Sequence, residues 1–105
     1  MVKYMGIWSL KPGFDPDETF RLWREKHTVW SKAKLLPEAK KYTIARVIDT
    51  LGQTDIYGMS QIVFEDVESA RRALNRVFSS PPDEFMAERV TNIRKIIVQE
   101  EEIEL

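Results

Sequence analysis

Runs rich in β-branched and aromatic residues alternate along the chain with stretches that repeat apolar residues at helical spacing. The β-type runs cover residues 2–9, 42–50, 56–64 and 94–103, and we expect each of them to form a strand. Turn-forming sequences separate them, such as Lys11-Pro12-Gly13 after the first run and Gly52 between the second and the third. The pattern therefore predicts four strands joined by turns and helices.

The first helical stretch begins where several helix-start rules agree. Asp15 can cap the helix, Pro16 suits its first position, and Glu18 is the third residue of a variant capping box. We expect this helix to reach about Lys34, because Pro37 cannot continue it.

A second helix is predicted after Asp66, which can serve as its cap. Its inward face is expected to carry Val67, Ala70, Leu74 and Val77. The Ser-Ser-Pro-Pro sequence of residues 79–82 ends this helix, and a short helical piece over residues 83–90 precedes the last strand.

The order β-α-β-β-α-β is typical of a single ferredoxin-like α+β domain, here residues 1–105. In that fold the helices cover one face of a four-stranded antiparallel sheet, so the other face should be polar. Instead, Ala45 and Val47 oppose Ile44 on the second strand, and the third and last strands also carry apolar residues on both faces. An exposed apolar face favours a homodimer that pairs through this open side, although isolated apolar residues also occur on ordinary surfaces.

Charge and composition narrow the range of partners. With 16 Lys and Arg against 17 Asp and Glu, the chain lacks the basic surplus that binds nucleic acid. It has no cysteine, which excludes disulfides and thiolate chemistry and fits a reducing compartment. No apolar run approaches the roughly 18 residues of a membrane helix, and no signal peptide is apparent. We therefore expect a cytoplasmic protein with no membrane or nucleic-acid partner.

The only histidine, His27, lies in the first predicted helix. At about 100° per residue it shares one stripe with Phe20 and Trp23, and Trp30 lies at the edge of that stripe. An imidazole turned toward the sheet suits general acid/base chemistry, because its ordinary pKa of about 6.5 lets it take and return a proton near neutral pH. The alternative is a histidine at the edge of the core, held by one hydrogen bond.

Tyr42, at the start of the second strand, is the candidate catalytic partner of His27, since its phenol could donate to a developing oxyanion. Ordinary packing against the helix is the alternative for this tyrosine and for the tryptophans. The expected substrate-binding residues are Phe20, Trp23, Trp30, Gln61, Phe85 and Met86.

Other charged residues carry weaker signals. One histidine, no cysteine and no paired carboxylate spacing argue against a metal site. Arg71, Arg72 and Arg76 recur on the outer side of the second helix, where we expect a solvated face. The glutamates of residues 100–104 are expected to form a solvated edge or a dimer contact.

Several short segments recur together in one known family. They are Lys11-Pro12-Gly13, Phe20, Trp23-Arg24-Glu25-Lys26-His27, Pro37 and Lys41-Tyr42, with a weaker match at Phe64-Glu65-Asp66. In this combination the chain resembles the EthD-type dimeric α/β-barrel family, with its K-P-G run, its F-x-x-W-x-x-x-H helix, and its proline and K/R-Y before the second strand.

The resemblance implies a ferredoxin-like fold whose sheets pair back to back into a barrel, with a small-molecule pocket between helices and sheet in each subunit. Its enzymes resemble muconolactone-type isomerases and polyketide cyclases, which move protons without a metal or organic cofactor. On this match His27 and Tyr42 would be partners in proton transfer. Gln61 stands where the family often carries Glu, which removes a second base, and Thr28-Val29-Trp30 departs from the small residue, proline and aliphatic group that often follow the histidine.

Three functions are consistent with these residues. The first is a cofactor-independent isomerase, lyase or cyclase that acts on a small cyclic carbonyl compound through His27 and Tyr42. The second is a module that binds or carries a hydrophobic metabolite without changing it. The third is haem binding through His27.

Overall fold

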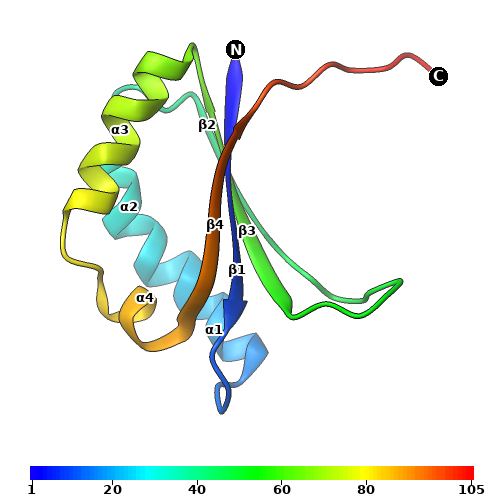
Figure 1. Ribbon diagram of the computed structural model, residues 1–105. Coiled ribbons are helices and arrows are strands. Elements are labelled where there is room, and N and C mark those ends of the chain that lie inside the picture. The colour runs from blue at the N-terminus through cyan, green and yellow to red at the C-terminus, as the bar shows by residue number, and fades with distance from the viewer.

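A four-stranded antiparallel sheet forms one layer of the protein, and all the helices cover the same face of it (Figure 1). The computed structural model describes residues 1–105. The strands are β1 (Val2–Leu10), β2 (Lys41–Arg46), β3 (Ile56–Phe64) and β4 (Val90–Val98), in the order β2-β3-β1-β4. The helices are α1 (Pro16–Leu22), α2 (Thr28–Leu35), α3 (Val67–Ser79) and α4 (Glu84–Arg89), and a π-helical turn, η1 (Trp23–His27), joins α1 to α2. The predicted ferredoxin-like α+β fold is confirmed.

Both predicted helix caps are present. The Asp15 carboxylate accepts a hydrogen bond from the Glu18 N–H at 2.8 Å, and that of Asp66 accepts from the Ser69 N–H at 2.7 Å. Each bond satisfies a backbone donor that has no partner within the helix. Within α3, however, Val67 is 43% exposed. It occupies the first helical position, and Ala73 joins the buried stripe in its place.

Two strands differ in length from the sequence expectation because their partners end. β2 stops at Arg46, which pairs with Gly58 close to the start of β3. β4 begins at Val90 directly after α4, and its last residue, Val98, pairs with Lys3 near the start of β1. Residues 99–105 therefore lie outside the sheet and are exposed.

The covered face of the sheet carries two hydrophobic clusters. One joins β1 and β3 to α2 and α3 through Tyr4, Leu35, Ile62, Phe64, Ala70, Ala73, Leu74 and Val77. The other is aromatic and consists of Trp8, Trp23, Tyr57 and Phe85. A Cβ atom at Gly58 would lie 2.6 Å from the Trp23 ring, so the close approach of the indole to β3 requires glycine there.

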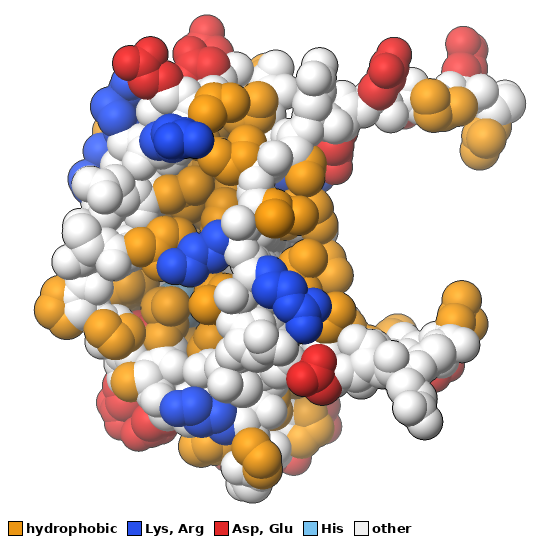
Figure 2. Space-filling view, viewed as in Figure 1, with side chains coloured by type: hydrophobic (Ala, Val, Ile, Leu, Met, Phe, Trp, Pro, Cys, Tyr) orange, Lys and Arg blue, Asp and Glu red, His pale blue; other side chains and the backbone are white.

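The open face of the sheet is largely apolar. The register places Met5 and Ile7 of β1 beside Met59 and Val63 of β3 on this side, and Ile96 of β4 is 45% exposed. Hydrophobic side chains run along it between two projecting segments, the β2–β3 connection and the C-terminal tail (Figure 2). Both segments carry exposed apolar residues, namely Ile48, Leu51, Ile103 and Leu105. None of the helices is long and apolar enough to span a lipid bilayer.

Candidate functional site

The helix that carries His27 contains the π-helical turn η1. Its buried residues, Thr19, Trp23, His27, Ser31 and Leu35, recur every four residues. A four-residue repeat drifts by about 40° per step on an α-helix of 3.6 residues per turn. The wider π turn takes up part of this drift and keeps both Trp23 and His27 on the sheet side. Phe20, expected on the inward stripe, is only half-buried, because a uniform α-helical wheel does not apply to this segment.

His27 is held by a carboxylate from the other end of the chain. Its Nδ1 lies 2.9 Å from Oδ2 of Asp83, and the two side chains are only 11% and 15% exposed. The second carboxylate oxygen of Asp83 accepts the Met86 N–H at 3.0 Å and so caps α4. Because the carboxylate only accepts, Nδ1 of a neutral imidazole carries the proton. The lone pair of Nε2, which makes no hydrogen bond to the protein, is then available as a base.

Two aromatic rings flank the imidazole. The ring centres of Trp30 and Phe85 lie 5.5 and 5.3 Å from that of His27. Together with Asp83 and Leu22, these rings line a groove of about 400 Å³ beside η1 and α4. This groove is not lined by His27 itself, and its other lining residues are charged, namely Lys26, Glu84, Glu88 and Arg89. Its volume lies within the range of about 300–1,000 Å³ that is usual for small-molecule sites.

Tyr42 reaches the same helix through Ser31. The Tyr42 hydroxyl lies 2.9 Å from the Ser31 Oγ, and that Oγ donates to the backbone carbonyl of His27 at 3.1 Å. Ser31 has a single hydroxyl proton, so Tyr42 is the donor in the bond between them. Burial raises the pKa of Tyr42, and the phenol is therefore protonated at neutral pH. The structure thus connects Tyr42 to the backbone of His27 and not to its imidazole.

A small inner cavity lies between the helices and the sheet, next to Tyr42. It measures about 40 Å³, and its polar lining consists of the side chains of Tyr4, Ser31, Tyr42 and Ser60. The Tyr4 hydroxyl makes no hydrogen bond, and burial together with the neighbouring Tyr42 raises the pKa of Tyr4. The space is far smaller than a ligand pocket. It places several neutral hydroxyl groups within otherwise apolar walls.

The other expected site residues are divided between separate places. Phe85 and Trp30 adjoin His27, whereas Trp23 packs in the aromatic cluster, with its ring 5.0 Å from that of Trp8. Met86 contributes its backbone N–H to Asp83. Gln61 lies on the opposite face of the sheet from Tyr42, because it neighbours Ile62, the residue that pairs with Tyr42. There it accepts a hydrogen bond from the Lys3 ammonium group at 3.1 Å.

Sequence reasoning missed Asp83, Ser31, Tyr4 and Ser60. Ser31 follows His27 by four residues, and this spacing indicated that it lies on the same buried face of the helix. The sequence placed Asp83 only at the start of a short helix, and nothing in the sequence relates it to a histidine 56 residues away.

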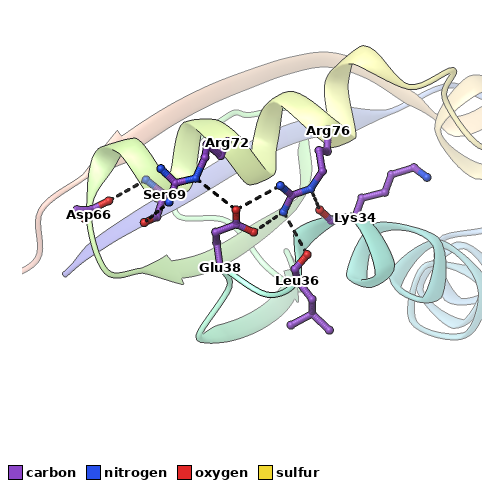
Figure 3. Close-up of polar contacts among 7 residues, drawn as sticks. All are labelled: Lys34, Leu36, Glu38, Asp66, Ser69, Arg72 and Arg76. Atoms are coloured by element: carbon purple, nitrogen blue, oxygen red, sulfur yellow. Dashed lines mark hydrogen bonds and ion pairs between the residues drawn. The ribbon is translucent and has the colours of Figure 1, made fainter.

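An arginine clamp ties α3 to the segment that follows α2 (Figure 3). Arg76 donates to the carbonyls of Lys34 and Leu36 at 2.8 and 3.1 Å and also binds the carboxylate of Glu38. Arg72 adds a longer contact to Glu38 at 3.5 Å. The expected solvated arginine face is present at Arg71 and Arg72, which are exposed. Arg76 is only partly exposed, because it binds an acidic side chain from another element. The hydrogen bond from Arg76 lowers the pKa of Glu38 to about 2.

The clamp predicts an acid-dependent loss of stability. Since the pKa of Glu38 is lower in the folded chain than its ordinary 4.5, its contribution is complete above about pH 4.5 and disappears as the pH falls toward 2. Glu38→Gln should lower Tm at neutral pH and flatten the decline of Tm over this range, which circular dichroism would measure. Glu101→Gln, in the exposed tail, is the matched control. Parallel Tm curves for wild type and Glu38→Gln would contradict the prediction.

Comparison with known proteins identifies the fold. No protein-family model matches the sequence, and no curated protein matches it. Among solved structures, an ethyl tert-butyl ether D (EthD) family protein from Bacillus halodurans superposes with a TM-score of 0.67 at 16% identity, covering 96% of this chain and 99% of that chain. SnoaB, a cofactor-independent oxygenase from Streptomyces nogalater, gives a TM-score of 0.60 at 14% identity, with coverage of 97% and 94%.

A third solved structure also shares the architecture. It is a dimeric protein of unknown function and ferredoxin-like fold from Bacteroides fragilis, with a TM-score of 0.58, 10% identity, and coverage of 93% and 94%. Identities this low establish the fold and not the activity. The chain therefore resembles the EthD-type proteins in fold over nearly its whole length, as its sequence motifs predicted.

Proposed function

We propose that the protein is a cofactor-independent enzyme of the isomerase, lyase or cyclase type that moves a proton on a small cyclic carbonyl compound. The observation that carries this proposal is the hydrogen bond between His27 and Asp83, set between two aromatic rings beside a groove of about 400 Å³. A base oriented by a carboxylate is the recurring arrangement for general acid/base catalysis. The SnoaB comparison adds that this fold supports cofactor-independent chemistry in another protein.

In the proposed reaction, Nε2 of His27 removes a proton from the carbon next to the carbonyl group. The bonding electrons of that C–H bond move toward the carbonyl oxygen and form an enolate. Asp83 stabilises the imidazolium that results, which exchanges its proton with solvent. The imidazolium then returns a proton to the same carbon or, where a C=C bond conjugates the enolate, to the far carbon of that system. The rings of Trp30 and Phe85 form apolar walls beside the imidazole.

Tyr42 is proposed to donate a hydrogen bond to the enolate oxygen. Its raised pKa supports this role, since a neutral phenol donates without giving up its proton. The bond to Ser31 would have to be exchanged for one to the substrate. This exchange requires the substrate oxygen to approach the inner cavity.

Proton exchange with solvent tests the proposal. Cyclic ketones and lactones would be incubated with the protein in D₂O, and deuterium incorporation would be followed by proton NMR. We expect stereospecific incorporation with wild type, its loss in His27→Gln, and a reduced rate in Tyr42→Phe. Unchanged incorporation in His27→Gln would refute the assignment of the base, provided that circular dichroism shows an intact fold.

A second candidate function is binding or transport of a hydrophobic metabolite without turnover. The separation of the two proposed catalytic groups favours it, because Tyr42 contacts Ser31 and not the imidazole. In this case compounds that bind would show no deuterium exchange, and His27→Gln would retain its affinity for them.

The open sheet face is proposed to pair two copies into a homodimer. Its apolar surface supports this, as does the dimeric neighbour from Bacteroides fragilis. Ile96→Glu would bury an unpaired charge in the interface and should weaken association at least about a hundredfold. Analytical ultracentrifugation would measure this, with Val29→Glu on the exposed side of α2 as the control. A dimer that persists in Ile96→Glu would place the interface elsewhere.

A further inference from the structure

A second groove, of about 390 Å³, lies between α2 and β2. Four cationic residues, Arg24, Lys32, Lys40 and Lys41, line it, and no acidic residue does. The side chain of Lys41, which pairs with Val63, belongs to the open face of the sheet, so Arg24, Lys32 and Lys40 supply the charge. The rest of the lining is largely apolar and includes Leu35 and Ile44. We call it the α2–β2 groove. All the charged residues of this lining are positive, whereas the whole chain has a net charge of −1.

None of these four cations has an acidic partner in the protein. The ion pairs of the chain involve other lysines and arginines. Glu38 is the only carboxylate between residues 28 and 44, and the arginine clamp of α3 binds it. The positive charge of the α2–β2 groove is therefore not neutralised from within.

These lysines do not donate to the free carbonyl groups at the C-terminus of α2 either. Cationic side chains near the C-terminus of a helix often donate to its free carbonyls. Here Arg76, from α3, donates to the carbonyls of Lys34 and Leu36 instead (Figure 3). The ammonium groups of Lys32 and Lys40 make no hydrogen bond to the protein and remain available to a ligand.

We propose that the α2–β2 groove binds the carboxylate of a small organic acid whose remaining atoms are apolar. The cationic residues favour a ligand that carries a negative charge, and the apolar lining favours a ligand whose remaining atoms are apolar. The volume lies in the usual range of about 300–1,000 Å³ for small-molecule sites. This groove shares no lining residue with the groove beside η1 and α4, so the inference assigns a separate binding site and does not rest on the proposed function.

The α2–β2 groove shares two lining residues with the inner cavity, Leu35 and Tyr42. A carboxylate held by Lys32 and Lys40 would leave the apolar body of the ligand beside Leu35 and Tyr42, which line the same groove. The Tyr42 phenol is a neutral donor at neutral pH, since burial raises its pKa. Anchoring the acid group at the rim would therefore bring a carbonyl at the other end of the molecule toward a hydrogen-bond donor.

Binding of a matched pair of probes to the full-length protein tests the proposal. 4-Phenylbutyrate and 4-phenylbutyramide have the same body and differ in charge. By calorimetry we expect the acid to bind at least about tenfold more tightly than the amide, and its affinity to fall with added salt. When the acid is added, the backbone amide NMR resonances of Lys40, Lys41 and Tyr42 should shift.

Charge variants provide the controls. Lys32→Gln/Lys40→Gln should weaken binding of the acid at least about tenfold and leave binding of the amide unchanged. Arg71→Gln/Lys95→Gln removes the same charge outside the groove and should bind the acid like wild type. Equal affinity for the two probes, or equal losses in the two variants, would overturn the proposal.

The acidic C-terminal tail of a second copy is the competing occupant. Without any probe, Glu101→Gln/Glu102→Gln/Glu104→Gln should leave the amide resonances of Lys40, Lys41 and Tyr42 unchanged. Shifts of these resonances would assign the groove to the tail and overturn the proposal. His27→Gln should bind 4-phenylbutyrate like wild type, so that a failure of catalysis at His27 and a failure of acid binding are separately observable.

Discussion

Replacing Asp83 with asparagine is expected to lower turnover about 10²- to 10⁴-fold, the range that general acid/base assistance supplies. The carboxylate accepts the Nδ1 proton of His27 and leaves Nε2 free to act as the base. An asparagine amide can donate to Nδ1 instead, which favours the tautomer with its proton on Nε2. It also removes the negative charge that stabilises the imidazolium.

The fold should survive this change, because asparagine caps helices as well as aspartate does and can keep the bond to the Met86 N–H. Rates of deuterium exchange across pH 5–9 would be compared for wild type, Asp83→Asn and His27→Gln. Because the two residues act as one unit, the double variant should lose little more than either single variant. Losses that multiply would show that the two residues act independently, and an unchanged pH profile in Asp83→Asn would refute the role of Asp83 in orienting the base.

Replacing Trp23 with alanine is expected to destabilise the fold by about 3–5 kcal/mol. The side chain is 1% exposed and packs against Trp8, Tyr57 and Phe85, so its removal leaves a large cavity. A domain of this size has a total stability of only about 5–15 kcal/mol. Much of the population should therefore unfold under mild denaturant.

Urea unfolding followed by circular dichroism would measure this effect. Trp30→Ala is the matched control, because Trp30 is only half-buried and its loss leaves a shallower cavity. We expect the loss in Trp30→Ala to be clearly smaller. Similar losses in the two variants would mean that the aromatic cluster is not the main support of this end of the sheet.

The elements of the fold were predictable because their signals are local. The carboxylates of Asp15 and Asp66 cap their helices as the sequence indicated, and β3 has the predicted bounds. The ends of β2 and β4 were not predictable from their own residues. Each strand stops where its neighbour ends, and this depends on the pairing register.

The candidate site was predictable only in part. The inward direction of His27 follows from the helical pattern, but its surroundings depend on the π turn, which that pattern does not reveal. Asp83 joins the site because α4 packs beside η1, a contact between distant parts of the chain. Tyr42 lies on the covered face as expected, yet its hydroxyl bonds to Ser31. Distances between side chains on different elements are not encoded in sequence spacing.

The double role of Asp83 couples two events that would otherwise be independent. One oxygen of its carboxylate holds the first turn of α4, and the other orients the imidazole. Any guest that displaces α4 would also move the carboxylate that orients the imidazole. By thermodynamic reciprocity, a change that separates the imidazole from Asp83 alters the affinity for that guest. Binding beside α4 and the orientation of the proposed base are therefore coupled through one side chain.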